Sequence, residues 1–422
     1  MHHVAAALAL SSAAVLAAGQ PENREPDFDL LAACPGENCS RQMRIVWHSS
    51  SPDCSLVYAP KTASRSTRAK YEKTKTPVAY TGHAEYWKYT ATLDGLKPGT
   101  KYIYRVVSDG AKSRTQTFKT AGTKGEFRFL WMGDVHSTPA KPKKMEAVAL
   151  LAANAAKAAP GDIDFVLFSG DLVKHGQTYS CWQEWNGAAP FAEYMMAFVP
   201  GNKEYYRDSG KTRWHNRWFT AARNNPPNGA SGLDSTFWFI YDSVMFIGID
   251  TLAGEAKEMD EGQRKSAQKG QFEWFEKVAT AQRGRYQYLV AFQHYPYFKK
   301  DGPASYGDYE KWRDVFDRCG VDFALSGDSH SYVRSRQLRN GRENQGGTVY
   351  VVCPEIDGHL GDADLQNGEG LVAKYDSNGS SYGACWFSVG KSEMTMHYFC
   401  KEPSDIDSVT VKAKRPPVRN RK

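Results

Sequence analysis

Residues 127–136 read FRFLWMGDVH, and residues 165–172 read FVLFSGDL. Each stretch is a short apolar run that predicts a buried strand, and each run ends at a Gly-Asp pair. Residues 145–158 are rich in Ala and Leu, and they predict a helix that ends before Pro160 and Gly161. A strand, a helix and a second strand in this order indicate a βαβ unit, and therefore an α/β domain.

The α/β pattern continues along the chain as far as residue 399. We expect further strands at residues 237–240, 244–249, 288–292, 322–325 and 349–352, helices at 181–196, 261–281 and 309–319, and a β hairpin at 383–399. These elements assign residues 123–401 to one α/β domain.

Residues 41–122 carry an all-β pattern instead. Within them, residues 96–106 read LKPGTKYIYRV, which is a Pro-Gly turn followed by a strand with aromatic residues at alternate positions. This segment resembles the E–F corner of a fibronectin type III-like sandwich, in which Tyr102 would be the corner tyrosine. We therefore predict a β-sandwich in front of the α/β domain.

The composition is that of a globular protein. The chain has 422 residues, of which 41% are hydrophobic and 24% charged, so disorder over most of its length is excluded. Much of the formal net charge of +7 lies near the C-terminus, and we predict a solvated basic tail at residues 402–422. The remaining chain is close to neutral, so no nucleic-acid partner is expected.

The N-terminus has the pattern of an export signal. Residues 4–18 are apolar and Ala-rich, which predicts a signal peptide at residues 1–19 and a polar linker at residues 20–40. The protein would then be secreted, that is, periplasmic or extracellular. No apolar run has the length of a membrane span.

The chain has eight Cys, and in an exported protein an even number allows disulfides. Cys34 and Cys39 could pair with each other or with Cys54. Cys385 and Cys400 lie on what the pattern predicts to be adjacent hairpin strands.

Polar residues collect where the predicted strands end. In α/β sheets, ligand sites form at the carboxyl ends of the strands. The residues at these positions are Asp134, His136, Asp171, Asn202, Lys203, Glu204, His294, Asp328 and His330. Five groups of polar residues in this order, each just past an apolar strand, are hard to assign to chance.

At these residues the sequence resembles a calcineurin-like metallophosphoesterase, whose pattern is D-x-H, then GD, GNH(D/E), a lone H and GHxH. Residues 321–334, VDFALSGDSHSYVR, resemble the last motif of the purple acid phosphatase branch, and residues 244–251 resemble its middle strand. The front sandwich also belongs to that branch. The resemblance covers roughly residues 40–400 and implies a β-sheet sandwich flanked by helices for the α/β domain.

The resemblance also implies two divalent or trivalent metal ions, and carboxylate, imidazole and amide ligands suit Fe, Mn or Zn. The first ion would be held by Asp134, His136, Asp171 and His330, and the second by Asp171, Asn202, His294 and Asp328. Asp171 would bridge them. Such a pair lowers the pKa of a bound water and stabilises the attacking and leaving oxygens of a displacement at phosphorus.

Three positions depart from the family pattern. Lys174 stands where the purple branch has a Tyr, so we do not predict a purple protein. Lys203 replaces a His that contacts the substrate and helps to protonate the leaving group. A Lys, with a pKa of about 10.4, is a poor acid near neutral pH but can hold phosphate as a point charge. Asp328 replaces the first His of the last motif and adds negative charge.

Lys203 and Asp328 leave two alternatives open. They could form an ion pair that replaces the second metal, so that only one metal binds. Alternatively both metals bind, and Lys203 is a phosphate anchor. His175, four residues after Asp171, is a reserve candidate for an acid or a substrate contact, although the sequence favours an ordinary His in an exposed loop.

The resemblance therefore implies a secreted, metal-dependent phosphoesterase, similar to an acid phosphatase, that hydrolyses phosphate esters with a metal-bound water or hydroxide. The alternative is a catalytically impaired relative that binds phosphate or glycan ligands through an altered second metal site. A nucleic-acid phosphodiesterase has little support, because the body of the chain carries little net charge. The oligomeric state is not indicated by the sequence.

Overall fold

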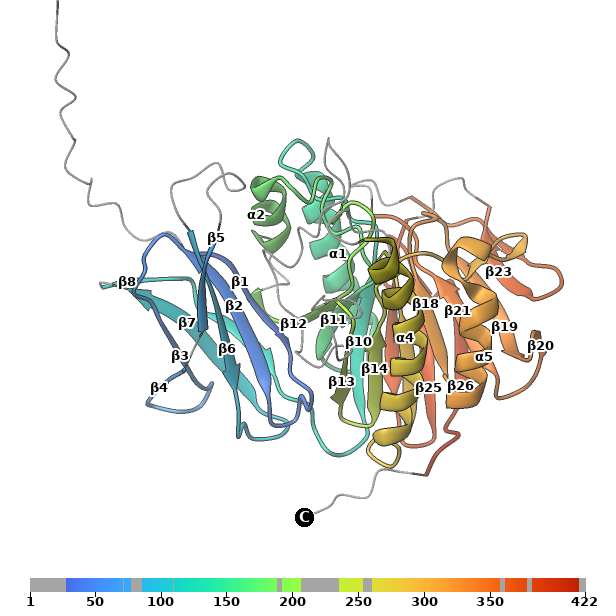
Figure 1. Ribbon diagram of the computed structural model, residues 1–422, viewed down its shortest axis with the longest axis horizontal. Helices are drawn as coiled ribbons and strands as arrows, with labels where there is room; N and C mark the ends of the chain where they lie inside the picture. The colour runs from blue at the N-terminus through green and yellow to red at the C-terminus, as the bar shows by residue number, and fades with distance from the viewer. Residues whose placement is uncertain are drawn as a thin grey trace, which may run out of the picture.

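The computed structural model describes residues 28–70, 72–76, 86–108, 110–187, 192–205, 235–252, 260–356, 361–377 and 382–416. Two domains lie side by side: an N-terminal domain of strands and a larger domain with helices on its outside (Figure 1). Among the described residues, no helix is both long and apolar enough to cross a membrane. The predicted signal peptide lies outside the described residues.

Two antiparallel sheets form the N-terminal domain. One has the strand order β1 (Phe28–Pro35), β2 (Met43–Ser49), β6 (Tyr86–Leu93) and β5 (Glu72–Thr76). The other has the order β4 (Thr67–Arg68), β3 (Ser55–Pro60), β7 (Lys101–Ser108) and β8 (Ala111–Lys112), with β9 (Gln116–Lys119) also paired to β7. Buried side chains of both sheets share one core, which confirms the expected β-sandwich.

In strand β7 the alternating aromatic residues of the sequence point into the core. Tyr102, Tyr104 and Val106 are buried and the residues between them are not, because successive side chains of a strand point to opposite faces. The hydroxyl of Tyr102 accepts a hydrogen bond from the backbone N–H of Lys97 at 2.9 Å, and its ring stacks on Phe118. The expected tyrosine corner is present.

The prediction of a linker at residues 20–40 is wrong for its described part. Strand β1 pairs with β2 and also packs on the larger domain. The side-chain amide of Gln183 donates to Asp29 at 2.9 Å, and that of Asn186 donates to the carbonyl of Leu31 at 3.2 Å. The segment is polar overall, but it contains a short apolar run. This run forms a strand because it is buried between β2 and the larger domain.

Two sheets packed face to face form the larger domain. The first has the order β12 (Met195–Phe198), β11 (Phe165–Phe168), β10 (Phe127–Met132), β24 (Ala384–Val389), β25 (Glu393–Phe399) and β26 (Asp407–Lys412). The second has the order β13 (Phe237–Tyr241), β14 (Val244–Gly248), β15 (Tyr288–Phe292), β18 (Phe323–Ser326), β21 (Thr348–Val352), β19 (Val333–Arg339), β23 (Val372–Asp376) and β22 (Leu365–Asn367). Strand β20 (Arg342–Glu343) pairs with β19, and β16 (Phe298–Lys299) pairs with β17 (Gly302–Pro303).

Aromatic side chains fill the space between these two sheets. The ring of Phe129 stacks on Phe387 at 4.4 Å and meets Phe246 of the second sheet edge-on at 5.2 Å. Phe165 meets the same Phe246 edge-on at 5.4 Å. Because each buried aromatic ring removes about 150–250 Å² from water, this layer fixes how the two sheets sit on each other.

Helices cover both outer faces. The helices α1 (Lys143–Ala158) and α2 (Tyr179–Gly187) pack on the first sheet, and α4 (Glu261–Ala281) and α5 (Tyr309–Cys319) pack on the second. Helix α5 buries Trp312, Val315, Phe316 and Cys319, which share one helical face, and it ends at Gly320 with a positive φ of 69°. The four layers confirm the predicted β-sheet sandwich flanked by helices.

The predicted helix at residues 181–196 is too long. It ends at Gly187, and residues 195–198 form β12, which pairs in parallel with β11. All four residues of β12 are buried. A short, continuous apolar run has neither the helical nor the strand period, so pairing with the sheet decides its conformation.

The predicted solvated tail is also wrong as far as residue 416. Strand β26 pairs antiparallel with β25 and extends the first sheet. Beyond it, Nζ of Lys414 lies 3.2 Å from the carboxylate of Asp322, and the guanidinium of Arg415 donates to the same carboxylate at 3.0 Å. Asp322 is fully buried, so these two cations neutralise a charge inside the domain.

None of the disulfides that the sequence allowed is formed. All eight cysteines lie in described segments, and all are buried and free. Cys385 faces Tyr398 across the β24–β25 pair instead of Cys400.

Candidate metal centre

The candidate site lies where parallel strands of the two sheets end. Strands β10, β11 and β12 pair in parallel in the first sheet, and β15 and β18 do so in the second. Their carboxyl ends are followed by Asp134 (β10), Asp171 (β11), Asn202 (β12), His294 (β15) and Asp328 with His330 (β18). The sheets thus bring the predicted metal ligands to one edge of the domain.

Hydrogen bonds join the loops that carry these residues. The backbone N–H of His136 donates to the carbonyl of Asp171 at 2.8 Å, which links the loops after β10 and β11. In the second sheet, the N–H of Gly327 donates to the carbonyl of His294 at 2.8 Å. The ligand-bearing loops are therefore tied to each other as well as to their strands.

Five predicted ligands have a left-handed backbone. The φ values are 51° for Asp134, 50° for His136, 50° for Asp171, 66° for Asp328 and 58° for His330. Residues other than Gly rarely adopt this conformation, although Asp, Asn and His do so more readily than most. Strained backbone of this kind gathers at functional sites, where the surrounding structure holds it in place.

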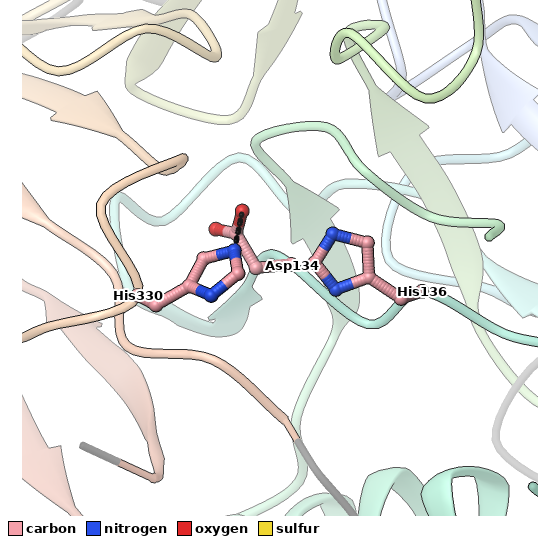
Figure 2. A group of neighbouring side chains, drawn as sticks. All are labelled: Asp134, His136 and His330. Carbon is pink, nitrogen blue, oxygen red and sulfur yellow. Dashed lines mark ion pairs between the residues drawn. The ribbon is translucent and has the colours of Figure 1, made fainter. Parts of the chain in front are cut away.

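Asp134, His136 and His330 form a first cluster (Figure 2). Their ligand atoms all lie within 4.8 Å of one another, and Nε2 of His330 lies 3.6 Å from Oδ1 of Asp134. Asp134 and His136 are buried, whereas the side chain of His330 is 35% exposed. The cluster therefore meets solvent on its His330 side.

Asp134 also belongs to a second, fully buried cluster with Asp171 and His294. The two carboxylate oxygens of Asp171 point to different histidines: Oδ2 lies 2.9 Å from Nε2 of His136, and Oδ1 lies 3.3 Å from Nε2 of His294. Asp171 thus contacts one histidine of each cluster, which is the position that a bridging ligand requires.

Asp328 lies beside the second cluster. Its backbone N–H donates to both carboxylate oxygens of Asp134 at 3.0 Å. Its own carboxylate lies 3.5 Å from Nε2 of His294 and accepts a hydrogen bond from the hydroxyl of Tyr306 at 2.9 Å. Among the described residues these are the partners of the carboxylate, so the ion pair with Lys203 that the sequence left open is not formed.

The remaining predicted site residues differ in how far they are buried. Asn202 and Lys203 are half-buried, and the backbone N–H of Lys203 donates to Oδ1 of Asp171 at 2.9 Å. His175 is exposed, and its carbonyl accepts a hydrogen bond from the N–H of Thr178. The fold thus brings Asn202 and Lys203 to the cluster and leaves His175 at the surface of the loop after β11.

Two glycines allow the loops to approach this closely. A Cβ on Gly201 would overlap Oδ1 and the backbone nitrogen of Asp171. A Cβ on Gly170, whose φ is 97°, would lie 2.7 Å from Nδ1 of His294. The Gly-Asn and Gly-Asp pairs in the sequence therefore mark close backbone contacts as well as turns.

Glu204 supports the site, a role that the sequence analysis did not assign to it. It is fully buried, and its carboxylate accepts hydrogen bonds from the backbone N–H groups of Asp171 (2.9 Å), Val173 (3.1 Å) and Gly201 (2.7 Å). Burial raises the pKa of Glu204 to about 7. Its place as the acidic residue of the GNH(D/E) pattern was the available signal.

Glu355 is the second residue that sequence reasoning missed. Its carboxylate lies 3.0 Å from Nδ1 of His330, 3.7 Å from Nδ1 of His136 and 3.6 Å from Nζ of Lys144. Burial would raise its pKa, but the two histidines and Lys144 lower it well below the ordinary range. Glu355 follows β21, a parallel neighbour of β18, so the rule of strand ends could have identified it.

Burial and neighbouring charges shift the ionisation of the ligand candidates. Burial raises the pKa of Asp134 to about 6. Burial also acts to raise the pKa of Asp171, but His294 and His136 lower it to about 2. Burial acts to lower the pKa of His136 and of His294, yet the facing carboxylates raise these values to about 9 and about 10.

The donor set fits a metal ion. Nε2 of His294 is buried and makes no hydrogen bond with any described residue, although two carboxylates lie within 3.5 Å of it. A buried polar atom is normally satisfied, so an atom left in this state calls for a further ligand. Imidazole and carboxylate groups that converge in this way suit Fe, Mn or Zn.

Two family models match the chain. "Purple acid Phosphatase, N-terminal domain" matches residues 32–120, and "Calcineurin-like phosphoesterase" matches residues 127–332. The chain therefore carries a purple acid phosphatase N-terminal domain followed by a calcineurin-like phosphoesterase domain.

Individual relatives are distant. Purple acid phosphatase 21 of Arabidopsis thaliana is 24% identical over 291 residues, which is 66% of this chain and 58% of that relative. The chain thus matches less than two thirds of the relative's length.

Two solved structures show the same fold. Purple acid phosphatase PPD1 from yellow lupin (Lupinus luteus) seeds superposes with a TM-score of 0.69 and 16% identity, covering 91% of this chain and 74% of that one. PhoD superposes with a TM-score of 0.62 and 14% identity, covering 90% of each chain. At these identities the similarity concerns the fold alone.

Proposed function

We propose that this protein is an exported, metal-dependent hydrolase of phosphate esters. The observation that supports this best is the pair of clusters that share Asp134, with Asp171 placed between His136 and His294. The calcineurin-like phosphoesterase domain supplies the reaction class. Export is proposed from the apolar run at residues 4–18.

The proposal assigns the ligands as the sequence predicted. The first ion would be held by Asp134, His136, Asp171 and His330, and the second by Asp171, Asn202, His294 and Asp328. A bound pair of such ions supplies Lewis acidity at phosphorus and a nucleophile at neutral pH.

The protein's own groups would orient these ligands. Glu355 contacts Nδ1 of both His136 and His330, so the Nε2 atoms of both rings are directed toward the aspartates. A carboxylate on the far nitrogen of a metal-binding histidine fixes the ring and increases its basicity. Glu204 holds the backbone of the site in place, because its carboxylate accepts hydrogen bonds from the loops that carry Asp171 and Asn202.

Lys203 and His175 are the catalytic candidates outside the ligand set. Lys203 would place a positive charge beside the phosphate, since its backbone is bound to Asp171. An ammonium group holds a phosphate as a point charge but gives up its proton reluctantly near neutral pH. His175, on the exposed loop after β11, is the proposed donor of a proton to the leaving group.

The test combines elemental analysis of the purified protein with an assay of nitrophenyl phosphate hydrolysis. We expect about two metal ions per chain and turnover that is lost on chelation and restored by added Fe, Mn or Zn. Metal-free protein that stays inactive with each of these ions would contradict the proposal.

A second candidate function rests on Asp328. Its carboxylate adds negative charge next to His294, which weakens the attraction of an anionic substrate. A metal-loaded protein that binds phosphate without turnover would favour a phosphate-binding or glycan-binding relative.

A further inference from the structure

A cavity lies at the junction of the two domains. Its volume is about 1020 Å³, which matches sites for small molecules, about 300–1,000 Å³. The N-terminal domain contributes Asn38, Ser40 and Pro98, and the larger domain contributes Asp242 and Ser243. Its cationic side chains are Arg41, Lys124, Arg283, Arg285 and Lys391. We refer to it as the basic cavity.

The basic cavity is separate from the candidate metal centre. Gly125, Ser243 and Gln287 line it, and they lie within two residues of the starts of β10, β14 and β15. The metal candidates Asp134 and His294 follow the other ends of β10 and β15. Strands of this length span about 17–20 Å, so the two sites lie at opposite ends of the sheets.

Positive charge in the basic cavity is largely unneutralised. In the part of the chain that the structure describes, the exposed side chains of Arg41, Lys124 and Arg283 make no hydrogen bond or ion pair. Arg285 bonds to a neutral partner, the side chain of Gln282. The ion pair of Lys391 with Glu126 is long, at 3.9 Å, and exposed.

Asp242 is the acidic residue among those that line the basic cavity. Oδ1 of Asp242 accepts a hydrogen bond from the backbone N–H of Gly125 at 3.0 Å. This bond ties the connection between the domains to the turn that joins β13 and β14. The bond from a neutral N–H leaves the charge of Asp242 in place, but this one carboxylate offsets only one of the five cationic side chains, so most of the positive charge remains available.

We propose that the basic cavity binds a small anion that carries several phosphate groups. Cations from several separate segments surround a wide space, and a ligand with several anionic groups can contact more of them than a single phosphate can. Guanidinium groups bind phosphate oxygens through paired, charge-assisted hydrogen bonds. Because Arg41 belongs to the N-terminal domain and Arg283 to the larger one, a bound ligand contacts both domains and stabilises their junction.

Calorimetric titration of the full chain with tripolyphosphate tests this proposal. A fixed excess of inorganic phosphate is present throughout, so that it competes for the candidate metal centre. The site variant is Arg41→Gln with Arg283→Gln, which removes one cation from each domain. The control variant is Lys157→Gln with Lys277→Gln, which removes the same charge from exposed positions of α1 and α4.

We expect tripolyphosphate to bind the wild-type and control proteins alike, and the site variant at least about tenfold more weakly. Tripolyphosphate should also raise the melting temperature of the wild-type protein more than that of the site variant. Equal affinity in all three proteins would overturn the proposal, and so would equal losses in the two variants, which would reveal an effect of net charge. Nitrophenyl phosphate turnover is measured separately, so failure of the proposed catalytic function would leave this result intact.

Discussion

Glu355 joins the two histidines of the first cluster to Lys144, so its charge acts on both rings at once. We expect Glu355→Gln to lower metal affinity about 10- to 100-fold, because an amide orients the rings less firmly and does not increase their basicity. Competition with a coloured chelator measures this change. Glu369→Gln, at an exposed position, is the matched control and should leave the affinity unchanged.

Asp171 contacts one histidine of each cluster. Asp171→Asn keeps the size of the side chain but removes the charge between His136 and His294. We expect metal content to fall for both ions and phosphoesterase turnover to fall by at least about 100-fold. The control is Asp301→Asn on the exposed β16–β17 turn, and full metal content in the Asp171 variant would contradict the bridging assignment.

The ligand histidines also predict how metal binding depends on pH. Facing carboxylates raise the pKa of His136 to about 9 and that of His294 to about 10, so both rings are protonated at pH 7 before a metal binds. A metal ion must displace these protons, and its affinity therefore increases as the pH rises toward 9. Each ion displaces the proton of one of these two histidines, so its affinity increases by up to about tenfold per pH unit. Chelator competition between pH 6 and about pH 8 measures this slope, and a flat profile would contradict it.

The loop after β12 depends on a residue without a side chain. Gly201→Ala would push a Cβ into Asp171, so we expect a loss of about 1–3 kcal/mol in the free energy of unfolding, together with a loss of metal. Denaturant unfolding measures the stability change. Gly187→Ala, where a Cβ meets no atom within 4 Å, is the control. An equal effect of the two substitutions would show that the close approach of the loop does not matter.

The segment after β26 is attached through charge. Arg415 donates to Asp322 and, at 3.0 Å, to the carbonyl of Cys319 at the end of α5. We expect Arg415→Gln to lower the free energy of unfolding by about 1–3 kcal/mol, because a buried carboxylate loses a charged partner. Arg342→Gln, on the exposed strand β20, should change stability little in the same measurement.

Helices and strands with a clear hydrophobic pattern in their own sequence were predictable. The helices at residues 261–281 and 309–319, and the strand at residues 127–132, begin and end where the sequence placed them. The failures share one cause: β1, β12 and β26 have weak local patterns. Pairing with a neighbouring strand decides each of them, and such partners lie far away in the sequence.

At the scale of the whole molecule, the sequence predicted which residues belong to the candidate site better than it predicted their contacts. Ligand types after successive strands were enough to gather Asp134, Asp171 and His294 at one edge of the domain. The partners of Asp328 were not predictable, because Tyr306 comes from a different loop and its direction depends on tertiary packing. Glu355 was missed because its loop carries no motif, even though its strand ends at the same edge.

The left-handed backbone at five of the ligand positions also limits how this protein can evolve. Asp, Asn and His tolerate that conformation better than other residues with a side chain, and Asp and His are the types found there. The replacement of a family His by Asp at position 328 stays within this set. Natural variation at these positions can therefore exchange one metal ligand for another, and thereby retune metal preference, with little penalty to the fold. Most other substitutions would disturb the loop before they altered the chemistry.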